Sequence, residues 1–434
     1  MEDGRAGRRA LSVLTTLNAL NYADRYVGAA VLPLILAGLA LSDAQGGLLQ
    51  SAFIVTYSLV SPMAGWAGDR YPRLPIAAAG VVIWSIAVIA SGLAPTFLLL
   101  LLARAVTGVG EAGYAVVTPS LLSDFYPREQ RGRAMAIFYA AMPVGTALGY
   151  AVGGTVGSHL GWQAAFFVAG APGLVLALLL ASLSEPPRGT FESGAPPAAS
   201  PLALGASLRA LLARPSYVYN TAAQVLYTFA MGGLAVWMPT YFVRERHIPL
   251  ATAATTFGVL LLIAGFVGTL AGGQLGDRVA RKLRGAQFSV SGWSLIASLV
   301  FTLTAILAPD PAVYWPAMFG ALFLLFLNVG PLNAAMANVL PADLRARGFA
   351  LTILAIHMLG DAASPWLIGV VSDRVGLTIP VLGAGALLGV SGVVLLAGRN
   401  ALDRDMQAVA GSAGPRTPLR QDKQVSGEEK RWHQ

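Results

Sequence analysis

The amino-acid sequence predicts an all-α integral membrane protein whose twelve transmembrane helices form two six-helix bundles. The chain of 434 residues is 56% hydrophobic and only 12% charged, whereas soluble proteins carry about 25% charged residues. Its apolar stretches are long enough to cross a hydrocarbon core of about 30 Å, which takes roughly 20 helical residues. Short polar motifs also recur at matching places in the two halves of the chain. Together these observations indicate a duplicated polytopic protein.

The spans follow one another along the chain, separated by short polar or turn-forming segments. They are predicted at 11–37, 45–68, 74–94, 96–122, 132–157, 162–183, 215–243, 251–275, 286–308, 312–339, 346–372 and 377–399. The segment EPPRGTFESGAPPAASP between the halves has the composition of a linker. The predicted domains are an N-terminal bundle at 1–183, a cytoplasmic linker at 184–214, a C-terminal bundle at 215–399 and a disordered cytoplasmic tail at 400–434.

Lysine and arginine are distributed unevenly between the two sets of loops. The N-terminus, the loops on its side and the C-terminal tail hold 24 of the 29 basic residues, whereas the opposite loops hold three, Arg244, Arg246 and Arg374. Because basic residues favour the cytoplasmic side, both termini are expected in the cytoplasm. The same asymmetry accounts for the net charge of +8 without a nucleic-acid partner.

The two halves share motifs at the ends of corresponding spans. Gly65-Trp-Ala-Gly-Asp-Arg70 follows span 2, and Gly273-Gln-Leu-Gly-Asp-Arg278 follows span 8. Pro127 to Arg131 and Pro341 to Arg345 form a second such pair after spans 4 and 10. A duplicated six-span unit in one orientation predicts the major facilitator fold, with substrate bound at the midplane between the halves.

The motif that begins at Gly68 resembles the cytoplasmic loop signature of that superfamily. An anion beside helix ends and cations could lock the halves together on the cytoplasmic side. The alternative is a simple polar turn with arginines on the inner side. The residues expected to form the latch are Asp69, Arg70, Arg73, Arg131, Asp277 and Arg278.

Span 1 carries a polar face in the middle of an apolar run. Asn21, Tyr22 and Arg25 fall on one side of the helix, and Asp24 lies beside them. Each charge costs about 2.5 to 3.5 kcal/mol within a span, so this face must look into protein or a cavity. Such groups usually mark a transport path or a proton relay. The alternative is a static salt bridge between helices.

Span 4 holds a second buried pair, Arg104 and Glu111, two helical turns apart on one face. Glu111 is the second candidate proton carrier, and a structural ion pair with Arg104 is the alternative. The run Gly108-Val-Gly-Glu-Ala-Gly113 matches G-x-G-x-x-G, but no strand precedes it, so a dinucleotide loop is excluded. Its glycines instead favour close helix packing.

Three further features have two interpretations each. In span 5, glycines at every fourth position from Gly145 to Gly153 resemble a drug-antiporter motif, but Tyr150 stands where that motif has proline, which favours helix packing. In span 11, His357 and Asp361 are one turn apart and could form a second proton site or a packing pair. Polar residues on spans 7 and 10 could line the cavity; these are Tyr219, Asn220, Tyr227, Asn328, Asn333 and Asn338.

Several function classes are excluded or disfavoured by composition. The absence of cysteine rules out disulfides and thiolate metal sites, and the four histidines are too scattered to suggest a metal centre. The sequence has no HExxH, Walker A or Gly-x-Ser-x-Gly motif, and its loops are too short for a catalytic domain. We therefore expect neither an enzyme nor a bound cofactor. A non-transporting membrane sensor is a minor alternative.

Taken together, these motifs resemble the spinster family. The resemblance rests on Asn21-Tyr-Ala-Asp-Arg25, on Gly108 to Tyr114 with Thr118 to Asp124, and on Phe138 to Tyr150. Spinster proteins are proton-coupled transporters of lysophospholipids and sphingosine phosphates. The resemblance implies that Asp24 and Glu111 are the protonation carboxylates and that Arg25 meets the lipid headgroup.

Anion:cation symporters of sugar acids share the span 1 motif and the Arg104–Glu111 spacing, whereas the runs at 119–124 and 138–150 favour spinster. We therefore expect a proton-coupled transporter of an anionic or zwitterionic amphiphile, with a symporter of sugar acids or other small organic anions as the alternative. The expected substrate-binding residues are Arg25, Asn21, Tyr22, Tyr227 and Asn328. The expected setting is the bilayer of a bacterial inner membrane, with the protein as a monomer.

Overall fold

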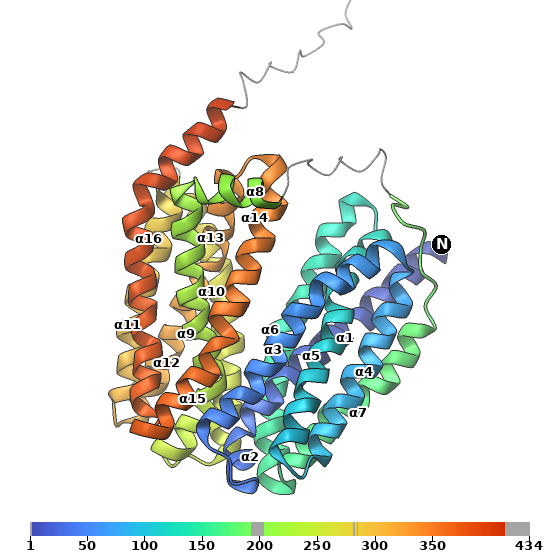
Figure 1. The fold of residues 1–434 in the computed structure, drawn as a ribbon, viewed down its shortest axis with the longest axis vertical. Helices are drawn as coiled ribbons and strands as arrows, with labels where there is room; N and C mark the ends of the chain where they lie inside the picture. Colours follow the sequence, from blue (N-terminus) through green and yellow to red (C-terminus); the bar gives the residue numbers. More distant parts are fainter. Residues whose placement is uncertain (1, 192–203, 281–282, 284, 413–434) are drawn as a thin grey trace, which may run out of the picture.

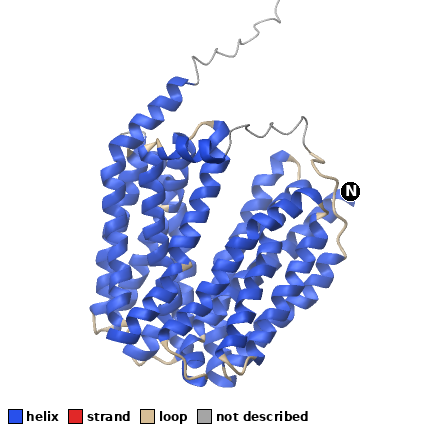
Figure 2. Ribbon diagram, in the orientation of Figure 1, coloured by secondary structure: helices blue, strands red, loops and turns tan. Residues whose placement is uncertain are grey.

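The computed structural model describes residues 2–191, 204–280, 283 and 285–412, and the described chain consists of helices and short connections (Figure 2). The N-terminal bundle contains α1 (Glu2–Ala30), α2 (Leu32–Gly38), α3 (Asp43–Arg70), α4 (Arg73–Leu93), α5 (Phe97–Asp124), α6 (Arg128–Leu160) and α7 (Trp162–Ala181). A short helix, α8 (Leu204–Leu212), precedes the second bundle. Each predicted span of the first half therefore corresponds to one helix, except that α1 and α2 together make span 1.

The C-terminal bundle repeats the arrangement with two interrupted spans. Its helices are α9 (Pro215–Glu245), α10 (Leu250–Ala280), α11 (Ala286–Leu307), α12 (Pro311–Leu327), α13 (Val329–Val339), α14 (Ala342–Ala355), the π-helical turn η1 (Ile356–Asp361), α15 (Ala363–Val375) and α16 (Thr378–Ser412). Span 10 breaks at Asn328, whose side-chain amide donates to the Leu325 carbonyl. Span 11 widens into η1, and such π-helical turns are frequent at functional sites.

The two bundles converge at one end of the molecule and diverge toward the other (Figure 1). Near the converging end lie α2, the start of α3 and the end of α15, and we call it the Asp43 end. The first residues of α1 and the helix α8 lie toward the diverging end, which we call the α8 end.

Eleven helical segments in the described part of the chain are long and apolar enough to cross a membrane. The first helix is not among them, because Asn18, Asn21, Asp24 and Arg25 lower its hydropathy. It is nevertheless 29 residues long, or about 43 Å at 1.5 Å per residue. With α1 as the twelfth, the predicted span count is confirmed.

Glycines let α1 and α6 touch along their length. A β-carbon at Gly145 would lie 2.0 Å from the Ala19 carbonyl oxygen, and one at Gly149 would lie 2.4 Å from that of Ala23. In α5, a β-carbon at Gly110 would lie 2.4 Å from the backbone nitrogen of Trp84. These contacts confirm close helix packing as a role of the glycine runs in spans 4 and 5.

One predicted boundary differs from the structure. Residues 400–412 were expected to belong to a disordered tail, but they continue α16 to Ser412. Their polar face is stabilised by local contacts, since the Asp403 carboxylate accepts from the Gly285 backbone N–H at 2.6 Å and the Asp405 carboxylate from that of Ser216 at 3.0 Å. The predicted linker at 184–214 contains the short helix α8. Residues 192–203 and 413–434 lie outside the described chain.

Candidate functional site

The centre of the N-terminal bundle holds a buried ion pair. The Arg25 guanidinium on α1 donates to Glu111 Oε2 on α5 at 2.8 Å, and the exposed fractions of the two side chains are 17% and 0%. The rings of Tyr22, Phe53 and Tyr57 surround the same guanidinium, with centroids at 4.8, 5.1 and 5.2 Å. The ring faces attract the cation. Arg25 is therefore held between one carboxylate and an aromatic cage, with a small part of its surface open.

Asp24 lies beside Arg25 in sequence but has a different partner. Its Oδ2 accepts from the Trp84 indole N–H on α4 at 3.0 Å, and its Oδ1 has no hydrogen-bond partner among the described residues. The residue is 0% exposed. A fully buried carboxylate with an unpaired oxygen is costly when ionised. Asp24 is thus a buried carboxyl group with one hydrogen bond from a neighbouring helix.

The ion pair between Arg104 and Glu111, which was the alternative interpretation of span 4, is not formed among the described residues. Arg104 instead donates to Gln50 Oε1 on α3 at 3.1 Å, and Glu111 is taken by Arg25. Arg104 is 2% exposed, and its guanidinium lies 5.1 Å from the Phe53 ring centroid. Phe53 therefore contacts both buried guanidiniums. Arg104 and Glu111 do not pair because residues seven positions apart lie about 10.5 Å apart along a helix. A side chain on a neighbouring helix can lie closer, as Arg25 does to Glu111.

The amide of Asn21 and the phenol of Tyr22, which belong to the predicted polar face of span 1, also lie at this cluster. Asn21 is 1% exposed and lies beside Glu111, and Tyr22 contacts Arg25. The cluster thus contains two cations and two carboxylates, drawn from α1 and α5. Because the charges balance when all four groups are ionised, removing any one leaves an uncompensated charge in a low-dielectric interior.

In the C-terminal bundle, Tyr227 and Asn328, two of the expected substrate-binding residues, line the same cavity. The cavity has a volume of about 240 Å³ and is also lined by Gln224, Asn333 and Thr352. Asn220 is buried elsewhere and donates to the Leu332 carbonyl at 3.1 Å. Tyr219 and Asn338 are not among the residues that line it. Of the six polar residues predicted to face the centre, the structure brings three together at this cavity.

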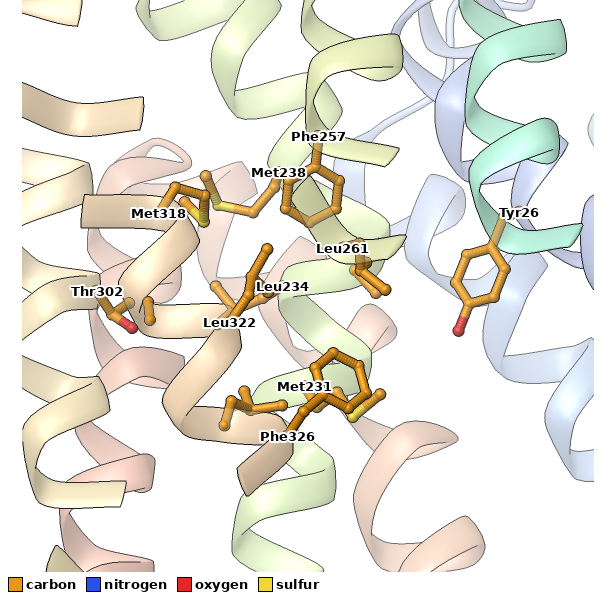
Figure 3. Close-up of a pocket in the computed structure, with 13 residues that line it drawn as sticks. Tyr26, Met231, Leu234, Met238, Phe257, Leu261, Thr302, Met318, Leu322 and Phe326 are labelled. Carbon is orange, nitrogen blue, oxygen red and sulfur yellow. The ribbon is translucent and has the colours of Figure 1, made fainter. Parts of the chain in front are cut away.

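A second, apolar pocket lies between α9, α10, α11 and α12 of the C-terminal bundle, with Tyr26 of α1 at its edge (Figure 3). Met231, Met238 and Met318 line it together with leucines and phenylalanines. Its free volume is only about 30 Å³, so a guest must displace side chains. Methionine side chains adapt readily to such changes. Met231 also lines the Tyr227 cavity, so the two hollows adjoin.

The predicted pair His357 and Asp361 is formed on η1. The imidazole Nδ1 lies 3.0 Å from Asp361 Oδ2, and the two side chains are 29% and 21% exposed. The Tyr57 ring of α3 lies 6.4 Å from the imidazole ring and also contacts Arg25. Tyr57 therefore connects the pair to the charge cluster across the bundle interface.

One residue predicted to latch the bundles at the α8 end, Arg73, has its partners within the N-terminal bundle. Arg73 lies 2.6 Å from Asp124 and 3.1 Å from Glu185, which also accepts from the backbone N–H groups of Arg73 and Leu74. Arg188 donates to the carbonyls of Gly68, Asp69 and Tyr71 at the end of α3.

The other predicted latch residues differ in their exposure. Asp69 and Arg70 are exposed, and Arg70 lies over the Trp66 ring. Arg131 is half-buried, Arg278 is exposed, and the side chain of Asp277 lies outside the described part. The bundles diverge at this end. The ion-pair cluster of Arg73, Asp124 and Glu185 joins α4, α5 and the segment after α7, all within the N-terminal bundle.

Sequence reasoning missed the polar contacts that hold the Asp43 end together. Asp43 accepts from the Arg244 guanidinium and the Ser372 hydroxyl, both at 2.6 Å. The Asp373 carboxylate accepts from the backbone N–H groups of Asp43 and Ala44 at 2.7 and 3.0 Å. It thus caps the start of α3 from the opposite bundle. The one signal available was that Arg244 is among the few basic residues in these loops.

Comparison with known sequences places the chain in a defined group. A sequence model described as the Major Facilitator Superfamily matches residues 14–365. Protein spinster homolog 1 of Homo sapiens is 34% identical over 390 residues, which cover 85% of this chain and 74% of the relative. The sphingosine-1-phosphate transporter SPNS2 of Xenopus tropicalis is 31% identical over 392 residues, with coverages of 86% and 75%.

Solved structures agree on the fold. A bacterial homolog to the human lysosomal transporter Spinster, in an inward-facing and unoccupied conformation, matches with a TM-score of 0.80 at 22% identity, covering 94% of this chain and 98% of that one. A D-xylose-proton symporter matches with a TM-score of 0.70 at 15% identity, with coverages of 89% and 96%. At these identities the likeness shows the fold alone.

Proposed function

The chain belongs to the spinster family of the major facilitator superfamily, and from this premise we propose that it is a proton-coupled transporter of an anionic or zwitterionic amphiphile. It is a multi-pass membrane transporter of the major facilitator type. The relatives named for sphingosine-1-phosphate transport suggest a lipid with a phosphate headgroup as substrate class. The α8 end, which carries most of the basic residues, is the cytoplasmic end in this proposal.

The observation that carries the proposal is that Arg25, a cation with one carboxylate partner, lies next to a residue that lines an apolar pocket. Arg25 holds a single carboxylate and keeps an open part of its surface. The next residue, Tyr26, lines the methionine-rich pocket of the opposite bundle. A phosphate headgroup suits a guanidinium because both can form two parallel hydrogen bonds. An alkyl chain suits the pocket, because each buried CH₂ contributes about 0.8 kcal/mol.

Coupling follows from competition for Arg25. When the headgroup takes the guanidinium, Glu111 loses the cation at 2.8 Å that neutralises it. A carboxylate that loses its cation in a low-dielectric interior favours the protonated form. Asp24, which already has an unpaired buried oxygen, responds in the same direction. Proton uptake therefore accompanies anion binding, and linkage requires that protonation tighten anion binding by the same factor.

Transport itself then requires the bundles to rock about the fixed site. In the structure the polar contacts of Asp43 close one end, and the bundles diverge at the other. The opposite state requires those contacts to break and the α8 ends to approach. The predicted latch residues would act in that second state.

A small organic anion such as a sugar acid is the second candidate. The observation that favours it is the Tyr227 cavity, whose Gln224, Asn328 and Asn333 amides could hydrogen-bond several hydroxyls. A lipid and a sugar acid are separated by their effect on thermal stability. We expect a long-chain lysophosphatidate or sphingosine phosphate to raise the unfolding temperature, and galactonate or glucuronate to leave it unchanged. The reverse order would favour the symporter.

The decisive experiment first identifies the substrate and then measures its transport under an imposed pH gradient. Lipids that co-purify with the protein would be identified by mass spectrometry, and the most abundant amphiphile would be loaded into proteoliposomes. We expect accumulation when a pH gradient is imposed and none when the gradient is dissipated. Binding without flux under either condition would instead indicate a sensor.

A further inference from the structure

A large cavity lies at the α8 end of the N-terminal bundle, away from the buried charge cluster. Its volume is about 750 Å³, and it is formed by the start of α1, the connection from α5 to α6 and the first turns of α6. Phe191, the last described residue after α7, also lines it. The transport scheme makes no use of this cavity.

The charges that line the cavity are all positive. Arg8 of α1 and Arg133 of α6 both border it, and none of the other lining residues is acidic. Both arginines are exposed, and within the described residues neither forms an ion pair. Two unpaired guanidiniums facing one hollow attract a ligand that carries a phosphate.

Side chains with hydrogen-bond donors, Tyr126 and Gln130, line the same cavity as these arginines. Partial burial raises the pKa of Tyr126, and the nearby Arg8 opposes that effect, so the phenol stays protonated at neutral pH and can donate to an anion. Pro127 and Gln130 place the start of α6 at the same cavity. The first turn of a helix favours an anion through its free N–H groups and its dipole.

The rest of the wall is apolar and continues onto the outer surface of α6. Leu11 and Ile137 line the cavity, and Ile137 is 43% exposed. Further along α6, Val144 is also exposed, two turns from Ile137 on the same face. Both residues belong to a predicted span, and in this inference their face of α6 contacts hydrocarbon. The cavity therefore joins a cationic, hydrogen-bonding mouth to a surface that contacts acyl chains.

We propose that this cavity binds an anionic phospholipid of the bilayer, with its phosphate between Arg8 and Arg133 and an acyl chain along Leu11 and Ile137. Basic pockets between transmembrane helices at one membrane face are suited to such headgroups. The bound lipid joins α1, the start of α6 and the segment that ends at Phe191. That segment carries Glu185 and Arg188, which hold the ends of α3 and α4. The lipid thus stabilises the N-terminal bundle at its α8 end and is not the transported cargo.

The test compares phosphatidylglycerol with phosphatidylcholine of the same acyl chains, added to the full chain purified in detergent. Thermal unfolding and native mass spectrometry would measure stabilisation and bound lipid. We expect phosphatidylglycerol to bind about tenfold more tightly than phosphatidylcholine. The double variant Arg8→Gln/Arg133→Gln should bind the two lipids equally. Equal binding of the two lipids by the unchanged chain would overturn the proposal.

The matched control removes two positive charges at the same end without touching the cavity. Arg5 on α1 and Arg209 on α8 are both exposed and do not line it. The double variant Arg5→Gln/Arg209→Gln should therefore keep the full preference, and its loss there would show a general charge effect and overturn the site. Inorganic phosphate distinguishes a free anion from a lipid. If phosphate at the same concentration displaced phosphatidylglycerol, the cavity would be a site for a soluble anion instead.

Discussion

The two bundles share one architecture but differ in the chemistry of their interiors. The N-terminal bundle buries Asp24, Arg104 and Glu111 at 2% exposure or less, with Arg25 beside them. At the corresponding depth the C-terminal bundle has amides, tyrosines and a methionine-rich pocket. Its nearest ionisable pair, His357 and Asp361, is partly exposed. The duplicated fold therefore assigns charge to one half and apolar surface to the other, which suits an amphiphile with a charged head and an alkyl tail.

The largest effect is expected from neutralising the carboxylates of the charged half. Asp24→Asn should bind substrate at least as well as the unchanged protein at pH 7.5, lose most of the pH dependence of binding, and fail to accumulate substrate. Glu111→Gln should do the same more weakly if Asp24 is the primary site. The reason is that each amide imitates the protonated carboxyl. Uptake into proteoliposomes under an imposed pH gradient measures the loss.

Asp310→Asn is the matched control for these variants, because Asp310 caps α12 at an exposed loop and asparagine caps helices equally well. It should transport normally. If both Asp24→Asn and Glu111→Gln still concentrate substrate against its gradient, the coupling scheme is wrong. The pair His357 and Asp361 would then be the next candidate proton site.

The second-largest effect is expected from replacing Arg25, which should weaken substrate binding. Arg25→Lys keeps the charge but loses the two-pronged geometry that suits a phosphate or carboxylate. We expect substrate binding to weaken by about 1 to 3 kcal/mol, or roughly fivefold to 150-fold, while the protein still folds. Calorimetric titration of a detergent-solubilised variant measures this. Near-normal binding would show that Arg25 serves packing alone.

Filling the apolar half should affect only the tail of the substrate. Ala321 lines the methionine-rich pocket, so Ala321→Phe should exclude a terminal part of an alkyl chain. The loss of about three methylenes would weaken a long-chain lipid by about 2 kcal/mol. A short-chain analogue serves as the control and should bind unchanged. Equal weakening of both ligands would place the chain elsewhere.

A smaller shift is expected where the halves meet at the Asp43 end. Arg244→Gln removes the ion pair with Asp43 while the Ser372 contact remains. Because Arg244 is 36% exposed in its side chain, we expect the state closed at this end to lose only about 1 kcal/mol. Distances between spin labels on the two bundles report the change. Arg374 is an exposed arginine in the same loops, and Arg374→Gln should leave the distance distribution unchanged. An equal shift in that variant would show that the Arg244–Asp43 ion pair does not specifically hold this end closed.

The smallest effect is expected at the ion-pair cluster of Arg73, Asp124 and Glu185, at the α8 end of the N-terminal bundle. Partial burial alone would raise the pKa of Glu185, but the backbone N–H groups of Leu74 and Arg73 and the Arg73 guanidinium lower it overall. The ionised form therefore stabilises the fold above the usual glutamate pKa of about 4.3, and this contribution is lost as the pH falls through the lowered value. Glu185→Gln should remove about 1 kcal/mol or less at neutral pH. Unfolding curves for the two proteins should converge in acid, and a constant difference across pH would contradict this account.

The amino-acid sequence by itself determined the spans, the duplication and the polar face of α1. These depend on local composition and helical period, which the chain specifies residue by residue. It also indicated that Asp24, Arg25, Arg104 and Glu111 are buried, because each lies within an apolar span. The extension of α16 to Ser412 was missed, since its polar surface resembles that of an unfolded tail.

Only the tertiary structure decided which buried groups meet. Arg25 pairs with Glu111, Asp24 accepts from Trp84, and Arg104 donates to Gln50, and every one of these contacts joins two different helices. The closure at Asp43 likewise joins α3 to α9 and α15. Helical period fixes the direction of a side chain on its own helix, but the distance to a neighbouring helix depends on how the helices pack, and here glycines along α5 and α6 set that packing.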